Sequence, residues 1–386
     1  MDNAATTRVH PEVLEEMIPF FSQEYGNPSA IYSLAGRAAK AVGIAREQVA
    51  NLIGARKEEI FFTSGGSESD NWALKAVAES FGAKGRHIIT TKIEHHAVLR
   101  VCEYLEKKGF EITYVDVDAQ GVLDLERLRS AIRPDTICIS VMAANNEIGT
   151  LQPLKEIGQL AHERGILFHT DAVQAFGHIP LDVDELQIDL LSASAHKLHG
   201  PKGVGILYIR KDVKLSAWLH GGSQERHRRA GTHNVPAIVG FGKAAQIAGE
   251  RMERSGEQMT LLREHFIDRV LTEIPGTRLN GSRERRLPGN VSVCFASLEG
   301  ESLLILLDQQ GICASGGSAC TTGATDPSHV MRAIGVEEEE ARGVIRFSLS
   351  EYTTLEEVDC TVDTLKDLVE KLRSIRLTGN IRSDFA

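Results

Sequence analysis

The sequence predicts an α/β protein with a large, mostly parallel sheet, followed by a smaller α+β domain. Short apolar segments alternate with helix-length segments between about residues 58 and 210. This alternation is typical of a parallel sheet that is covered by helices on both faces. After about residue 236 the pattern changes to longer helical segments with two further apolar runs. A length of 386 residues also favours two domains over one.

The expected elements follow in order along the chain. Apolar runs predict strands at 60–62, 87–90, 112–115, 136–141, 166–169, 188–191 and 204–209. Helices are expected at 68–81 and near 96–108 in this first region. The second region predicts helices at 236–254, 258–273 and 300–309, strands at 291–295 and 344–348, and a terminal helix near 354–373. We expect a large domain at 12–255, a small domain formed by 1–11 and 256–376, and a polar tail at 377–386.

Composition argues against several functional classes. The net charge is −10 and the pI is about 5.8, whereas nucleic-acid-binding proteins usually carry a basic face, so direct nucleic-acid binding is not expected. No apolar stretch reaches the roughly 18 residues that a membrane span needs, and the N-terminus does not resemble a signal peptide. The six cysteines lack CxxC spacing, which favours a reducing, cytoplasmic location without disulfides. No metal site is expected.

Two features lie where strands of the predicted sheet end, which is where such folds bind ligands. The glycine-rich turn at 63–68 leads from a strand into a helix and predicts an anion site, because backbone N–H groups at a helix start attract phosphate. A plain turn capped by serine is an equally good interpretation. Asp171 follows the strand at 166–169 and is placed to hold a protonated ring nitrogen. The alternative is an N-cap for the next helix.

Two further residues indicate covalent chemistry. Lys197 lies between two expected strands among small residues, where a deprotonated amine could form an imine with an aldehyde cofactor, although a surface lysine is the simpler alternative. Cys320 lies in a run of small residues with three glycines, which favours an exposed, reactive thiol over a buried one. Cys313 is ambiguous. The cysteines expected to be structural are Cys102, Cys138, Cys294 and Cys360.

Beyond these features, the chain resembles the NifS/IscS-type cysteine desulfurases over residues 2 to about 372. These belong to the class V aminotransferases, within the fold-type I (aspartate aminotransferase-like) enzymes that depend on pyridoxal 5'-phosphate (PLP). The motifs that carry the resemblance are DNAATT at 2–7, GNPS at 26–29, TSGGSESDN at 63–71, EHHAVL at 94–99, NNEIGT at 145–150, HTDAVQA at 169–175, SASAHKLHGPKG at 192–203, RRAGTHN at 228–234, SACTTG at 318–323 and IRFSLS at 345–350.

The resemblance implies a role for each matching position around the cofactor ring. It assigns Lys197 to the imine with PLP and to the substrate's Cα proton. Asp171 is expected to pair with the ring nitrogen and Gln174 to hydrogen-bond the ring hydroxyl. His95 is expected to stack on the ring and to assist proton transfer.

The resemblance also implies how the phosphate and the substrate are bound. Gly66, Ser67, Ser194 and His196 are expected to hold the phosphate. Thr232 matches a phosphate ligand that the neighbouring subunit donates, which implies an obligate homodimer. Arg346, with Asn146, is expected to bind the substrate carboxylate, a task that suits a guanidinium. A structural ion pair is the alternative for Arg346.

The activity that the resemblance implies is removal of sulfur from L-cysteine, with L-alanine as product and a persulfide on Cys320. A selenocysteine lyase and a PLP-dependent aminotransferase are alternatives on the same fold, and a non-catalytic binding protein is a third. The persulfide is expected to pass to an acceptor protein in iron–sulfur cluster assembly, tRNA thiolation or thiocofactor synthesis. The polar C-terminal stretch lacks the apolar motif that housekeeping members use on their scaffold partner, so the choice of acceptor stays open.

Overall fold

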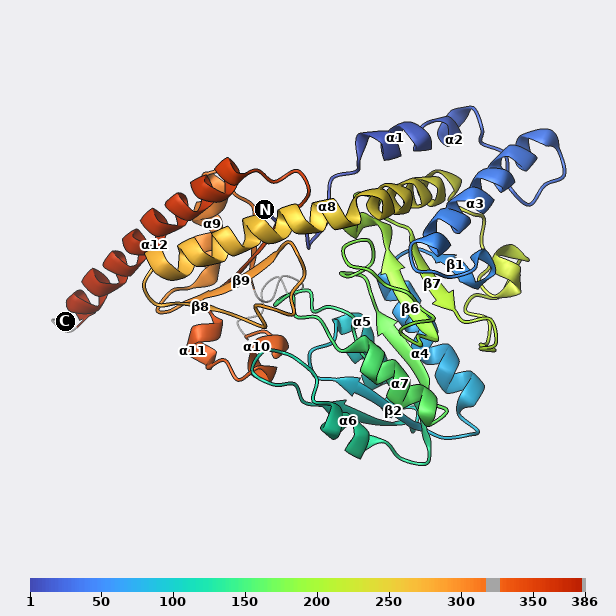
Figure 1. Cartoon of the computed structure of the whole chain (residues 1–386), viewed down its shortest axis with the longest axis horizontal. Helices are drawn as coiled ribbons and strands as arrows, with labels where there is room; N and C mark the ends of the chain where they lie inside the picture. Colours follow the sequence, from blue (N-terminus) through green and yellow to red (C-terminus); the bar gives the residue numbers. More distant parts are fainter. Residues whose placement is uncertain (317–326, 384–386) are drawn as a thin grey trace.

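The structure is a computed structural model that describes residues 1–316 and 327–383, and the side chains up to residue 375. Two sheets lie in separate halves of the molecule and the long helix α8 runs across both (Figure 1). Among the described helices, none combines the length and the apolar character that a membrane crossing requires. The division into domains at 12–255 and 256–376 stays a prediction.

The larger sheet has seven strands in the order β1-β7-β6-β5-β4-β2-β3. Strands β2 to β6 pair in parallel, and only β7 pairs antiparallel with its neighbours β1 and β6. The prediction of a mostly parallel sheet is therefore confirmed. The strands are β1 (Ile60–Thr63), β2 (His87–Thr91), β3 (Glu111–Val115), β4 (Thr136–Ser140), β5 (Leu167–Asp171), β6 (Leu190–Ser194) and β7 (Gly205–Ile209).

Helices cover both faces of this sheet because alternate strand residues are apolar on both sides. Phe61 packs edge-on against Trp72 of α4, with ring centroids 5.6 Å apart, while its neighbours Ile60 and Phe62 join the core on the opposite face. That face is covered by α3, α7 and the start of α8. The helices of this half are α1 (Pro11–Met17), α2 (Pro19–Ser22), α3 (Ser33–Asn51), α4 (Gly66–Phe81), α5 (His96–Glu106), α6 (Leu125–Ala131) and α7 (Leu154–Glu163).

The smaller half is built on a four-stranded antiparallel sheet in the order β10-β11-β9-β8. Its apolar core joins this sheet to the second half of α8, to α9 and to α12. The strands are β8 (Thr277–Leu279), β9 (Asn290–Phe295), β10 (Ser315–Gly316) and β11 (Val344–Ser348). The helices are α9 (Gly300–Gln309), α10 (His329–Ala333), α11 (Glu338–Ala341) and α12 (Leu355–Ser383).

Two helix predictions are wrong in extent. The helices expected at 236–254 and 258–273 form one continuous helix, α8 (Val235–Glu273). The residues between them, Ser255 and Gly256, favour a break locally, but packing on two cores holds the helix together. The terminal helix α12 also extends beyond residue 373, to Ser383, so that much of the polar tail is helical.

The N-terminal segment, residues 1–7, crosses from the small sheet to the large one. Asp2 forms a parallel bridge with Ser348 of β11, and the backbone N–H of Thr7 donates to the carbonyl oxygen of His196, 3.0 Å away. The segment therefore connects the small sheet with the loop that follows β6.

Candidate active site

A cavity of about 630 Å³ opens at the edge of the large sheet where the parallel strands β5 and β6 end. Such an edge is where α/β folds bind their ligands, because the loops that leave the strands there can diverge. Residues of both halves and of the N-terminal segment line it. They include Ala4, Ala5, Gly66, Ser67, Asp70, His95, Asn146, Glu147, Asp171, Gln174, Ser194, His196, Lys197, Ser328, His329, Arg332 and Arg346.

Lys197 reaches this cavity from the 3₁₀ turn Ala195–Lys197, which directly follows β6. Its Nζ donates hydrogen bonds to the carbonyl oxygens of Ala4 at 2.6 Å and Ala5 at 2.9 Å. Nε2 of Gln174 donates to the same Ala4 oxygen at 3.0 Å. The N-terminal segment thus orients both the lysine and the glutamine.

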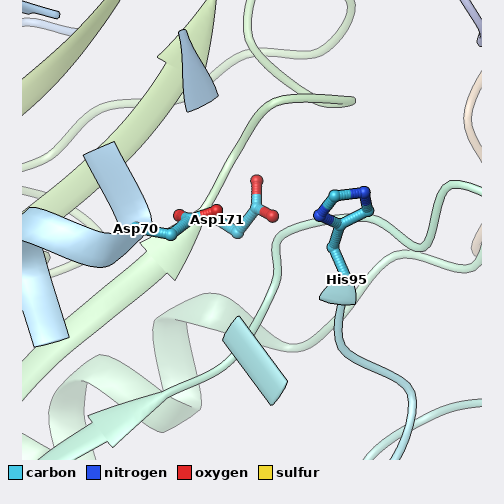
Figure 2. Close-up of side chains that lie close together, drawn as sticks. All are labelled: Asp70, His95 and Asp171. Carbon is cyan, nitrogen blue, oxygen red and sulfur yellow. The ribbon is translucent and has the colours of Figure 1, made fainter. Parts of the chain in front are cut away.

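Asp171 forms the buried end of β5, and a second carboxyl group lies beside it. Asp70, on α4, and His95 place their polar atoms within 4.8 Å of one another and of the Asp171 carboxylate (Figure 2). Burial raises the pKa of both carboxyl groups, and the charge of Asp171 raises the pKa of Asp70 further. Two adjacent buried carboxyl groups rarely ionise together, so this pair favours a single negative charge.

Asp70 lies beside a neutral histidine, and His95 is oriented by the helix that it caps. Oδ1 of Asp70 has no hydrogen-bond partner among the described residues. His169, whose Nε2 lies 3.6 Å from that oxygen, has its pKa lowered to about 3 by burial and is neutral. His95 caps α5, where its Nδ1 accepts the N–H of Ala97 at 3.1 Å. The proton of a neutral His95 is therefore on Nε2.

A second hollow of about 410 Å³ adjoins the cavity at the start of α4. Gly66, Ser67, Ser194 and His196 line both spaces, as expected for a phosphate site. Burial lowers the pKa of His196 to about 4, so its ring is neutral, and Nδ1 lies 3.1 Å from Oγ1 of Thr6. The 16-residue helix α4 begins here at Gly66, and its free N–H groups favour an anion.

Arg346, on β11, lines the same cavity as Lys197 and Asp171. Its Nη1 donates to the backbone carbonyl oxygen of Asn146 at 2.8 Å, and its Nη2 donates to Oδ1 of Asp2 at 3.1 Å. The structure thus brings Arg346 and Asn146 together. The observed contact uses the main chain of Asn146.

Several cavity residues were not assigned a role from the sequence. Glu147 accepts a hydrogen bond of 2.6 Å from Oγ of Ser328, and burial raises its pKa to about 7. The rings of His96 and His329 lie 4.8 Å apart at their centroids. Glu147 and His96 stand inside the NNEIGT and EHHAVL motifs, so motif membership was an available signal. Ser328 and His329 belong to the other half of the molecule, and their place along the chain gave no indication that they would line the cavity.

Two predicted residues cannot be counted among those that line the cavity. Thr232 is exposed and does not line the cavity of its own chain. Cys320 lies outside the described residues. Of the cysteines expected to be structural, Cys102 and Cys138 are buried, as is Cys294. The expectation that Cys360 is structural is wrong, because this residue is exposed on α12. Cys313, which the sequence left ambiguous, is also exposed.

Known proteins match this chain over almost its whole length. The class-V aminotransferase family matches residues 1–360. A curated relative from Methanosarcina thermophila, cysteine desulfurase IscS, is 53% identical over 375 residues, which are 97% of this chain and 93% of that protein. The chain belongs to the cysteine desulfurases of the class-V aminotransferase family.

Solved structures share the fold of this chain. A NifS-like protein superposes with a TM-score of 0.91 at 43% identity, covering 96% of this chain and 99% of that one. SspA in complex with cysteine superposes with a TM-score of 0.81 at 39% identity, covering 92% and 99%. The expected fold-type I architecture is therefore confirmed, and the chain is an enzyme of a PLP-dependent family.

The cysteine desulfurase site fits PLP in this chain. Asp171 offers a buried carboxyl group at a strand end, where a pyridinium nitrogen would be paired. The turn at the start of α4 needs glycine, because a Cβ on Gly66 would lie 2.4 Å from Cγ2 of Val173. A Cβ on Gly205 would lie 2.7 Å from Cα of Gly65 and would displace that turn.

Proposed function

We propose that this enzyme removes sulfur from L-cysteine, forming L-alanine and a persulfide on Cys320. The observation that carries the proposal is the convergence of Lys197, Asp171 and Arg346 on one cavity. An amine, a buried carboxyl group and a buried guanidinium are the groups needed to hold PLP and an amino acid together. Family membership, with a relative named cysteine desulfurase at 53% identity, supports the same activity.

PLP would be held by the residues already described. Asp171 would face the ring nitrogen and keep it protonated, Gln174 would face the ring hydroxyl, and His95 would lie against the ring. Gly66, Ser67, Ser194 and His196 would surround the phosphate. When bound, PLP supplies an electron sink that stabilises negative charge on the carbon next to the substrate's amino group.

The protein's own groups bind the substrate and move its protons. Arg346, with Asn146, binds the α-carboxylate, and a guanidinium gives this contact direction as well as strength. The amine of Lys197 takes the proton from Cα. Because the carbonyl oxygens of Ala4 and Ala5 already receive its N–H groups, the amine has a fixed starting position. His95, which lines the same cavity, assists proton transfer.

Sulfur transfer then requires a thiolate. The sulfur of Cys320 attacks the substrate sulfur, so that an S–S bond forms as the bond between Cβ and sulfur breaks. The electron pair of the broken bond stays with the carbon skeleton, which takes up a proton and leaves as L-alanine. The enzyme retains the transferred sulfur as the Cys320 persulfide.

The setting of the enzyme is also part of the proposal. We propose a homodimer in which Thr232 of each subunit contacts the phosphate site of the other, which is supported by its exposure away from its own cavity. A cytoplasmic location is supported by five free cysteines among the described residues. The persulfide would pass to an acceptor protein of iron–sulfur cluster assembly, tRNA thiolation or thiocofactor synthesis.

Turnover of the PLP-loaded enzyme tests this function. L-cysteine with a thiol reductant should yield sulfide and L-alanine in equal amounts. Strong preference for L-selenocysteine over L-cysteine would identify a selenocysteine lyase instead. Formation of a keto acid, dependent on an added keto-acid acceptor, would identify an aminotransferase.

A further inference from the structure

Asp2 contacts Arg346, which with Asn146 forms the proposed binding site for the substrate carboxylate (the clamp). Its Oδ1 accepts a hydrogen bond of 3.1 Å from Nη2 of Arg346. The side chain of Arg346 is only 4% exposed, and its Nε has no hydrogen-bond partner among the residues that the structure describes. A buried guanidinium needs a counterion, and unused donors leave it able to bind a further anion.

The carboxylate of Asp2 is fixed on its other side as well. Its Oδ2 accepts a hydrogen bond of 2.9 Å from Oγ of Ser315. Ser315 lies on β10, directly opposite Arg346 in the antiparallel pair β10–β11, and the backbone of Asp2 bridges to Ser348 on β11. Asp2 is therefore fixed to the sheet that carries Arg346.

This arrangement sets the charge of the clamp. Arg346 and Asp2 together are electrically neutral, and a bound amino-acid carboxylate brings the group to a net charge of −1. Like charges in a partly desolvated site repel each other, so Asp2 opposes every carboxylate that Arg346 binds. Substrate and product carry the same carboxylate. L-alanine lacks the thiol, however, and so depends more heavily on the carboxylate for its binding.

We propose that Asp2 limits the strength with which Arg346 holds amino-acid carboxylates, so that L-alanine leaves the site readily. The identity of the product rests on the proposed function. The electrostatic effect of Asp2 does not, because it applies to any amino acid bound at Arg346.

The substitution Asp2→Asn tests this proposal, because it removes the charge and keeps the size of the side chain. The amide oxygen can still accept from Arg346, and the amide nitrogen can donate to the hydroxyl of Ser315. Equilibrium dialysis of labelled L-alanine against the PLP-loaded enzyme should give a Kd roughly tenfold lower in Asp2→Asn than in the unchanged protein. The KM for L-cysteine should also be lower in Asp2→Asn than in the unchanged protein. Ethylamine, which has no carboxylate, should bind both proteins equally.

Controls separate this effect from others. Asp212→Asn changes the net charge equally at an exposed position outside the cavity and should leave the L-alanine Kd unchanged. Unchanged or weaker L-alanine binding in Asp2→Asn, with ethylamine binding preserved, would overturn the proposal. If Asp2→Asn does not retain PLP, Asp2→Ser gives the same comparison with a smaller neutral side chain. Absence of sulfide release from the unchanged enzyme would contradict the proposed function alone, since L-alanine binding does not require desulfuration.

Discussion

The side-chain nitrogen of Lys197 donates a 2.6 Å hydrogen bond to the carbonyl oxygen of Ala4, 193 residues earlier in the chain. The same N-terminal segment contacts Arg346 through Asp2. The amine and the guanidinium of the site are therefore connected by a short turn of the N-terminal segment. The arrangement supports the view that residues 2–5 are part of the active site and not only of the fold.

Loss of the proposed sulfur acceptor should abolish turnover without loss of PLP. We expect Cys320→Ala to reduce sulfide release from L-cysteine by on the order of 10³-fold, because a covalent nucleophile has no substitute in the transfer step. PLP absorbance should be unchanged. Cys313→Ala and Cys360→Ala are matched controls, since both thiols are exposed, and each should retain full activity. Full activity in Cys320→Ala would refute the assignment.

The clamp predicts that lysine cannot replace arginine at position 346. Arg346→Lys keeps the charge but loses the planar donors that reach Asn146, Asp2 and the substrate together. We expect kcat/KM for L-cysteine to fall roughly 100-fold, mainly through KM. Arg342→Lys, which alters an exposed ion pair with Glu338, serves as the control. A normal KM in Arg346→Lys would show that the carboxylate binds elsewhere.

If Thr232 is shared between subunits as proposed, two inactive variants should complement each other. Thr232→Ala and Lys197→Ala should each be impaired as homodimers. In a mixed dimer, one site has both substitutions and the other has neither, because the intact Thr232 comes from the Lys197→Ala subunit. Mixing after dissociation and reassembly should therefore restore sulfide release. If Thr232 served the site of its own chain, each mixed site would contain one defect and no activity would return.

Glu94 predicts a pH dependence of stability. Burial raises the pKa of this carboxyl group from an ordinary value of 4.5 to about 8. Its neutral form is therefore favoured in the folded state, and this contribution is fully present below pH 4.5 and is lost as the pH rises through about 8. The loss is on the order of a few kcal/mol.

Thermal unfolding at several pH values between 5 and 8.5 measures this effect (roughly the window in which the group titrates). Glu94→Gln keeps an oxygen for the hydroxyl of Thr91 and the N–H of Met142. Its Tm should fall less than that of the unchanged protein as the pH rises. Glu253→Gln, at an exposed position, should follow the unchanged protein. Parallel Tm profiles for all three proteins would contradict a neutral Glu94.

Local pattern was enough to predict the parallel sheet and part of the site. Asp171 and Lys197 follow buried strands, and the ends of parallel strands meet at one edge whatever the intervening helices do. The turn at Gly66 was recognisable from its glycines and its place between β1 and α4. These predictions needed only the order of elements along the chain.

Contacts between distant segments could not be predicted in the same way. Nothing around Asp2 indicates a partner on β11, and nothing around Ser328 indicates Glu147. The continuity of α8 was missed for a related reason. Helix propensity near Gly256 is weak, and only burial against two separate cores compensates for it.

That continuity has a mechanical consequence. At 1.5 Å per residue, the 39 residues of α8 form a continuous helix about 58 Å long. Phe241 anchors one end in the core of the large sheet, and Phe266 anchors the other in the core of the small sheet. A rotation of one sheet relative to the other would bend α8. We therefore expect the distance between the amine of Lys197 and the guanidinium of Arg346 to change little. For the sulfur transfer proposed above, we therefore expect short segments to move while the two sheets keep their spacing.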